Sequence, residues 1–140
     1  ESLENGYPAD MWADTFAVNV TGVFLTVQAL LPNLRKSSNG KIAIISSTMA
    51  SQERAPGGSY IYRASKAAAL NLGRNLAKDL AKDTISVGIY HPGWVITDMG
   101  GADADIKVEE AALGLRDRIN DLSMAKSGCF ENWDGSPHVF

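Results

Sequence analysis

Tyr62 and Lys66 are the residues whose types and spacing point most directly to chemistry. Residues four apart lie on one face of a helix, so a helical Tyr62 and Lys66 would point into the same space. A free phenol titrates near pH ~10, but a cation about 4–6 Å away favours the phenolate and can lower its pKa by roughly 1–3 units. Such a pair can give and take a proton near neutral pH. The alternative is a solvated helix face that carries both residues by chance.

Hydrophobic periodicity predicts the elements before and after this pair. A long helix is expected from about Ala9, with apolar residues at steps of three and four: Trp12, Phe16, Val20, Val23, Val27, Leu31 and Leu34. The apolar run Lys41 to Ile45 predicts a strand buried on both faces, as in a parallel sheet. The alternating run Ile85 to Tyr90 predicts a second strand.

Further helices are predicted between and after these strands. The first runs from about Ser59 to Lys82, and its expected inner face holds Ala64, Ala68, Leu72, Leu76 and Leu80. The next runs from about Val108 to Leu122, and its expected inner face holds Ala112, Leu115 and Ile119. Gly128 to Phe130 is the candidate for a last short strand. Helices that alternate with buried strands predict an α/β fold with a parallel sheet and right-handed crossovers.

The candidate chemistry converges on one edge of this sheet. In open parallel sheets, ligands bind at the carboxyl ends of the strands. Ser46-Ser47 and His91-Pro92-Gly93 both come directly after predicted strands, and Tyr62 begins the helix after the first of those loops. The site is therefore expected at this edge.

Composition narrows the class of protein. The 140 residues, 45% hydrophobic and 21% charged, are typical of one soluble globular domain. A net charge of −3 without a basic block argues against nucleic acid as a partner, and the one cysteine, Cys129, excludes an internal disulfide. The longest apolar run is far shorter than a membrane-spanning segment, and no signal peptide is visible. We expect a cytoplasmic protein with no membrane partner and no metal site.

Four sequence blocks, in order, resemble the short-chain dehydrogenase/reductase family, in particular its C-factor-like and sniffer-like carbonyl reductase branch. The blocks are Phe16 to Gly22, Ile44 to Ser47, Tyr62 to Ala68 and His91 to Met99. The resemblance implies a Rossmann-like, doubly wound parallel sheet. It also implies that residues 1–140 are the C-terminal part of a single NAD(P)-binding domain, with the N-terminal half and its Gly-rich cofactor turn missing.

The resemblance also assigns roles. It makes Tyr62 the catalytic acid/base, Lys66 the lysine that assists the tyrosine and holds the nicotinamide ribose, and Ser47 the hydroxyl that bonds the substrate oxygen. Asn19 matches the helix asparagine whose backbone holds a relay water. Residues that match the cofactor wall are Pro92, Gly93, Val95 and Thr97. The implied cofactor is NAD(P)(H), and the residue that separates NAD from NADP belongs to the missing half.

Several assignments keep an alternative. Ser46 is the fallback for Ser47, which could also be only a loop-capping serine. Tyr60 competes with Tyr62, but Ala64 rather than a lysine lies four residues after it. Asn19 could be a structural residue at a helix kink. Trp94, Met99 and Trp133 either line a substrate pocket or pack in the core.

Three remaining residues are given no chemical role. His91 is expected to be only a strand-end residue, and His138, in the tail, receives no role. Cys129 is expected to be a small buried residue.

Two functions of different classes are consistent with these residues. The first is an oxidoreductase that moves hydride between NAD(P)(H) and a carbonyl or secondary alcohol, with Tyr62 as proton donor. The second is a catalytically silent fragment or a signalling or interaction protein, favoured by the absent Gly-rich turn. Relatives often pair through two long helices, here residues 9–36 and 59–82, so a homo-oligomer is an expected partner state.

Overall fold

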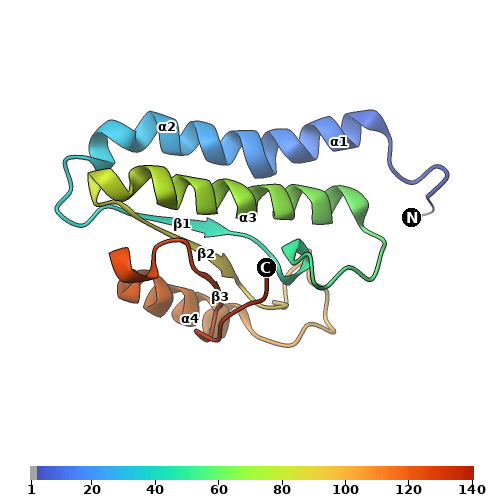
Figure 1. Cartoon of the computed structure of the whole chain (residues 1–140). Helices are drawn as coiled ribbons and strands as arrows, with labels where there is room; N and C mark the ends of the chain where they lie inside the picture. Colours follow the sequence, from blue (N-terminus) through green and yellow to red (C-terminus); the bar gives the residue numbers. More distant parts are fainter. Residues whose placement is uncertain (1–2) are drawn as a thin grey trace.

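The structure, a computed structural model, describes residues 3–140, so residues 1 and 2 of the predicted domain lie outside it. Its helices and strands alternate along the chain (Figure 1). In order, the main elements are α1 (Ala9–Phe16), η1 (Ala17–Thr21), α2 (Gly22–Leu34), β1 (Lys41–Ile45), α3 (Tyr60–Leu80), β2 (Ser86–His91), α4 (Val108–Asp121) and β3 (Phe130–Asn132). Short 3-10 turns lie at Thr48–Ala50, Ala81–Asp83 and Met124–Lys126.

The strands form one parallel sheet in the order β1-β2-β3. Lys41 pairs with Ser86 at one end of the β1–β2 ladder, and Ile45 pairs with Tyr90 at the other. In Figure 1, α3 covers one face of the sheet, α1 and α2 run beside α3, and α4 lies on the opposite face. The predicted α/β class and the parallel sheet are confirmed.

The first predicted helix is continuous but contains a π-turn. α1, η1 and α2 follow one another without a break, and in the π-turn Gly22 N–H donates to Ala17 O, five residues back. A Cβ on residue 22 would lie 3.2 Å from that oxygen, so glycine leaves room for the widened turn. Asn19 is the middle residue of this turn. π-turns of this kind are rare and occur frequently at functional sites.

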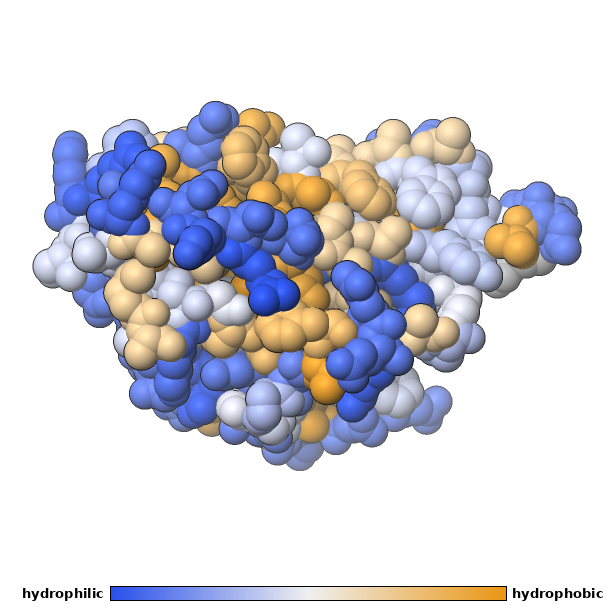
Figure 2. All heavy atoms as spheres, viewed as in Figure 1, coloured by the Kyte–Doolittle hydropathy of each residue, from blue (hydrophilic) through white to orange (hydrophobic). Residues whose placement is uncertain are grey.

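This helix is more apolar than the sequence interpretation allowed. Ala9–Leu34 is long and apolar enough, by length and composition, to cross a membrane, and no charged residue lies between Asp14 and Arg35. The expectation that every apolar run is far too short was therefore wrong on this criterion. Core helices of soluble proteins and signal sequences pass the same test, so one such helix is weak evidence for a membrane. Figure 2 shows apolar patches among hydrophilic residues where α1 and α2 run.

The core lies between the sheet and the face of α3 and α2 that packs on it. Its buried apolar residues come from all three strands, from α2 and α3 and from nearby turns: Val27, Ile42, Ile44, Ala50, Ala69, Leu70, Ala77, Leu80, Ile85, Val87, Ile89 and Phe130. Most strand members alternate along β1 and β2, because every second strand side chain points to the same face.

The inner face of α3 differs from the prediction. Its buried residues are Ile61, Ser65, Ala69, Leu70, Gly73, Ala77 and Leu80, whereas Ala64, Ala68, Leu72 and Leu76 are only partly buried. The expected face was therefore wrong except for Leu80, which is buried, and Leu76, which is partly buried and packs against the core. Small residues recur every four positions from Ser65 to Ala77, and a helix can approach a sheet closely where its side chains are small. The sequence interpretation relied on the large apolar residues instead.

Two other burial predictions were wrong. β1 is buried on one face only, since Ala43 and Ile45 are exposed and Ile45 keeps 43% of its surface accessible. β1 is also the edge strand of the described sheet. On α4, Ala112 is exposed and Ala111 is the buried residue, while Leu115 and Ile119 are partly buried.

Gly73→Val in the complete protein is expected to lower the free energy of unfolding by about 1–3 kcal/mol, because added atoms would overpack a tight contact. A Cβ at this position would lie 2.6 Å from Ile89 Cγ1 and 3.1 Å from Ile44 Cδ1. The measurement is urea unfolding, with Lys78→Val on the exposed face of the same helix as the control. Equal effects of the two substitutions would contradict the packing argument.

Candidate active site

A cleft opens at the carboxyl edge of the sheet, where the sequence placed the chemistry. Its volume is about 1120 Å³, and its walls come from the segments after β1, β2 and β3, from the start of α3 and from the tail. The lining residues used below are Ser46, Ser47, Thr48, Arg54, Tyr62, His91, Pro92, Gly93, Trp94, Val95, Thr97, Met99, Trp133 and His138. A cleft of this size accepts a ligand of drug or cofactor size.

Tyr62 and Lys66 share the first turns of α3, as their spacing predicts. Lys66 Nζ lies 5.7 Å from the centroid of the Tyr62 ring and donates a hydrogen bond of 3.1 Å to Ile45 O, the last carbonyl of β1. Burial lowers the pKa of Lys66 from its usual value. An ammonium has three donors, so two of them remain after the bond to Ile45 O, although Lys66 is not among the residues that line the cleft.

The two serines after β1 are engaged differently. Ser46 is buried, and its hydroxyl donates to Lys66 O at 3.0 Å, so its proton is already used on the α3 backbone. Ser47 Oγ instead accepts a hydrogen bond of 3.1 Å from Met49 N–H, which caps the adjoining 3-10 turn. A hydroxyl that accepts still has its own proton to donate. The capping role and the catalytic role of Ser47 are therefore compatible.

Asn19 does not line the cleft but contacts the helix that carries Tyr62. Its Nδ2 donates to Ser65 Oγ at 3.0 Å, and Ser65 Oγ donates to Tyr62 O at 2.9 Å. The π-turn thus holds Asn19 against α3 between the two predicted catalytic residues. The structural interpretation of Asn19, as a residue at an irregular point of the helix, describes this arrangement well.

The segment after β2 forms another wall of the cleft that Ser46, Ser47 and Tyr62 line. Gly93 has φ +88°, and a Cβ there would lie 2.5 Å from Ile106 Cδ1. Val95 bridges to Ile106, and Thr97 Oγ1 accepts a hydrogen bond from Gly100 N–H. These contacts close a compact loop whose predicted members Pro92, Gly93, Val95 and Thr97 all line the cleft.

The aromatic and apolar residues of the predicted pocket also line the cleft. Trp94 is about half exposed, and its indole N–H donates to Gly100 O at 2.8 Å. Met99 is 88% exposed, so it is available to contact a ligand and contributes little to the core. Trp133 packs close to Gly93 and Gly114. The pocket interpretation therefore fits Met99 and Trp94 better than core packing does.

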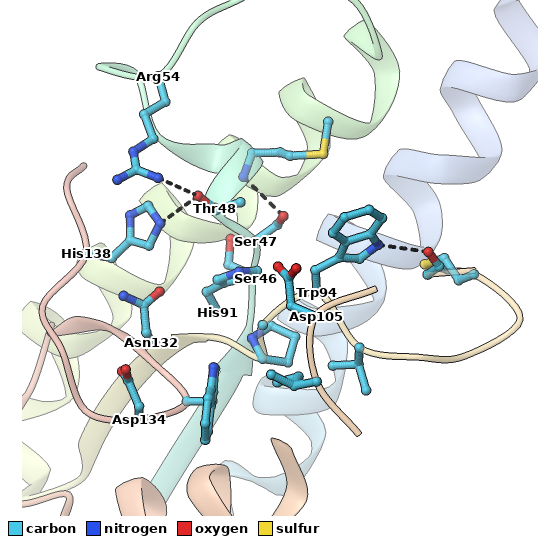
Figure 3. Close-up of a pocket in the computed structure, with 18 of the residues that line it drawn as sticks. Ser46, Ser47, Thr48, Arg54, His91, Trp94, Asp105, Asn132, Asp134 and His138 are labelled. Carbon is cyan, nitrogen blue, oxygen red and sulfur yellow. Dashed lines mark hydrogen bonds between the residues drawn. The ribbon is translucent and has the colours of Figure 1, made fainter. Parts of the chain in front are cut away.

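The tail supplies a further wall, in which Trp133 was a predicted pocket residue and His138 was given no role. His138 is buried, and its Nε2 lies 2.8 Å from Thr48 Oγ1, while its Nδ1 lies 2.8 Å from Val139 O. A carbonyl can only accept, so Nδ1 of His138 carries a proton and donates to Val139 O. Arg54 lies next to the same threonine, and Figure 3 shows Arg54, Thr48 and His138 grouped at one end of the cleft.

The tail is attached to the loop after β1 at further points. Ser51 Oγ and Glu53 N–H both donate to Phe140 O, at 3.1 and 3.2 Å. The Arg74 guanidinium lies 4.1 Å from the centroid of the Phe140 ring. The family resemblance indicated Trp133 as a pocket residue, but the Gly, Pro and aromatic composition of the tail does not say where its last residues dock.

His91 is the last residue of β2, which confirms the strand-end prediction, but it also lines the cleft. Burial lowers the pKa of His91 to about 4, with smaller contributions from the nearby His138 and Arg54. The rings of His91 and His138 are 5.9 Å apart and meet edge to face. Nδ1 of His91 is buried without a hydrogen-bond partner in the described structure. A neutral imidazole suits such surroundings.

His91 predicts a loss of stability in acid. Its pKa in the folded protein lies below the unfolded value, so its contribution is complete above about pH 6.5 and is lost as the pH falls toward 4. The free energy of unfolding should fall by about 1–3 kcal/mol between these pH values. This range is below the full value of the pKa shift, because solvent screens the partly exposed ring. Unfolding free energies at pH 7.5 and 4.5 measure it, and His91→Asn should show a smaller drop. An equal drop in the variant would contradict this assignment.

Two other titratable residues considered from the sequence, Cys129 and Tyr60, do not line the cleft. Cys129 is partly exposed rather than fully buried, and burial raises the pKa of its thiol. Tyr60 is exposed and packs its ring against Tyr7 at 5.1 Å, away from any lysine at helical spacing. Among residues 3–140, no group of three or more His, Cys, Asp or Glu side chains is arranged to hold a metal ion.

The fold and this arrangement of residues match a known family. The family description "short chain dehydrogenase" matches residues 3–106 of the chain, which therefore belongs to the short-chain dehydrogenase family. The predicted resemblance is confirmed.

Two relatives show how far the similarity reaches. The chain is 37% identical over 129 residues to C-signal of Myxococcus xanthus, across 91% of this chain and 77% of that protein. It is 39% identical over 124 residues to 1-hydroxy-2-glutathionyl-2-methyl-3-butene dehydrogenase of a Rhodococcus species, across 85% of this chain and 54% of that protein.

Solved structures agree with this assignment. Carbonyl reductase Sniffer of D. melanogaster superposes with a TM-score of 0.93 at 29% identity, and an NADPH-bound carbonyl reductase from chicken fatty liver with a TM-score of 0.91 at 30% identity. Both cover 100% of this chain, which spans 61% of each of them.

Proposed function

We propose that the protein is an NAD(P)(H)-dependent oxidoreductase that interconverts a carbonyl compound and a secondary alcohol. The observation that carries this proposal is the arrangement of Tyr62 and Ser47 on one cleft, with Lys66 behind the tyrosine on the same helix. Family membership supports an oxidoreductase in general, and the two reductase structures support the carbonyl as substrate class.

Each residue then has one task in the reduction direction. Tyr62 gives its phenolic proton to the carbonyl oxygen as negative charge develops on it. Ser47, whose oxygen already accepts from Met49, donates its own proton as a hydrogen bond to the same carbonyl oxygen. Lys66, anchored on Ile45 O, keeps a positive charge beside the phenol and stabilises the phenolate after transfer. Asn19, on the neighbouring helix, holds the turn of α3 that carries Tyr62 and Lys66 through its hydrogen bond to Ser65.

The residues at the cleft fit a nicotinamide cofactor. Pro92 and Gly93 form a wall without a long side chain, Val95 and Thr97 continue it, and the free Lys66 donors suit ribose hydroxyls. The bound cofactor would supply or accept the hydride. Trp94 and Met99 would contact the substrate beside it. The chicken reductase was solved with NADPH, so NADPH is the first nucleotide to test.

The state and location of the protein are part of the proposal. The exposed apolar residues of α1–α2 support a homo-oligomer that pairs through this helix and α3. A cytoplasmic location and the absence of membrane and nucleic-acid partners remain predictions.

The test is turnover by the complete protein. NADPH and NADH oxidation is measured with a panel of aldehydes, ketones and quinones, and nucleotide binding is measured separately by fluorescence. Turnover of a carbonyl with one of the nucleotides is the expected result. A folded protein that binds neither nucleotide and reduces none of the compounds would overturn the proposal and favour the catalytically silent alternative.

A further inference from the structure

Ser65 is a fully buried hydroxyl that the catalytic assignment leaves without a task. Its exposed fraction is 0%, and it lies three residues after Tyr62 and one before Lys66. On a helix, residues three apart are neighbours, so Ser65 lies next to Tyr62 on the side of α3 that contacts the π-turn. The hydroxyl meets Asn19 there.

The directions of the two hydrogen bonds are fixed by the groups involved. Ser65 has one hydroxyl proton, and Tyr62 O, which can only accept, takes it at 2.9 Å. Ser65 Oγ must then accept from Asn19, so the amide nitrogen of Asn19 faces it at 3.0 Å. The result is a directed chain from Asn19 through Ser65 to the carbonyl of Tyr62.

The Asn19 end of this chain is positioned by an irregular backbone. Asn19 is the middle residue of the π-turn, which contacts α3. The widened turn is made by the Gly22 N–H to Ala17 O bond, and it changes the direction of every later side chain relative to a regular helix. The structure therefore combines a π-turn, a buried serine and the catalytic turn of α3 at one point.

We propose that Ser65 is a positioning residue, which fixes the catalytic turn of α3 against the π-turn and so sets the position of Lys66 relative to Tyr62. The side chain of Asn19 acts on the catalytic turn through this hydroxyl. This inference rests on the proposed function. It adds a residue whose side chain touches neither substrate nor cofactor.

The expected consequence is a change in catalysis that exceeds the change in folding. Ser65→Ala leaves Asn19 Nδ2 without its acceptor and removes the hydrogen bond that joins α3 to the π-turn. A misplacement of about 1 Å can cost roughly 10²-fold in rate, so kcat is expected to fall about 10- to 100-fold. KM for the carbonyl should change little, because Ser65 does not line the cleft.

Two further readouts separate positioning from simple loss of stability. The pH–rate profile of Ser65→Ala should shift toward higher pH, because a displaced ammonium assists the phenolate less. Asn19→Ala should shift it in the same direction, and the Asn19→Ala/Ser65→Ala double variant should be no slower than the slower single variant. Ser86→Ala is the matched control, since Ser86 is also buried but begins β2, at the end of the sheet away from the cleft.

A last measurement does not depend on turnover. The Lys66 ammonium, held by Ile45 O, gives a nitrogen-detected NMR signal that should move in Ser65→Ala and Asn19→Ala and stay in place in Ser86→Ala. If the wild-type protein reduces no carbonyl, the proposed function fails and this signal still decides the positioning role. A Ser65→Ala protein with unchanged Lys66 signal, or with unchanged kcat and pH profile despite a lower Tm, would overturn the proposal.

Discussion

Tyr62→Phe in the complete protein is expected to lower kcat by about 10²–10⁴-fold, the usual contribution of a general acid or base. The substitution removes only the phenolic oxygen, so the ring that Lys66 faces at 5.7 Å remains in place. Nucleotide affinity should stay close to the wild-type value, because Lys66 and the wall from Pro92 to Thr97 are unchanged. Steady-state kinetics and fluorescence titration with NADPH measure the two quantities.

The control for this variant lies two residues away. Tyr60 is on the same helix, is exposed and packs on Tyr7, and it has Ala64 where Tyr62 has Lys66. Tyr60→Phe should therefore keep nearly full activity. Undiminished turnover in Tyr62→Phe, or an equal loss in Tyr60→Phe, would remove Tyr62 from the role of proton donor.

Gly93→Ala is expected to destabilise the protein through two separate effects. The residue has φ +88°, and a side chain in left-handed backbone costs roughly 1–2 kcal/mol. The new Cβ would also lie 2.5 Å from Ile106 Cδ1 and 2.9 Å from Trp133 Cδ1, and such overpacking costs about 1–3 kcal/mol. The turn that faces the cleft would have to move, so kcat/KM should fall as well.

Gly101 allows the two effects to be separated. It has φ +81°, but a Cβ there would meet no atom within 4 Å. Gly101→Ala should therefore show the backbone cost alone. Urea unfolding of both variants gives the difference, which measures the contact with Ile106 and Trp133. Equal losses of stability would show that the clash is relieved without cost.

The order of helices and strands, and the edge at which the cleft opens, were predictable from the sequence. Alternating helical and strand periodicity determines a parallel sheet, and the loops after parallel strands all begin at the same edge of that sheet. For this reason the sequence correctly predicted four residues of the cleft wall: Ser46, Ser47, Pro92 and Gly93. Tyr62 and Lys66 share one face of α3 because their spacing depends only on local geometry.

The predictions that failed depend on contacts between distant segments. The burial of α3 depends on its small residues, because the helix lies between the sheet and a second helix, and periodicity records only the large apolar residues. Ile45 is exposed because no described element covers that face of β1. The π-turn at Asn19 had a partial signal in Thr21-Gly22, but its partner Ser65 is 46 residues away. His138 received no role because its neighbour Thr48 is 90 residues away.

The docking of the tail sets the order in which the cleft can be completed. Ser51 and Phe140 are 89 positions apart, and their hydrogen bond is one of those that hold the loop after Ser47. During synthesis the chain emerges from its N-terminus, so α3 and the β1–β2 pair can form before the tail has left the ribosome. The loop that carries Ser47, Thr48 and Arg54 gains its contacts with Phe140 only after the tail has emerged. A nascent chain would therefore pair β1 with β2 before β3 joins the sheet and before the tail completes the cleft.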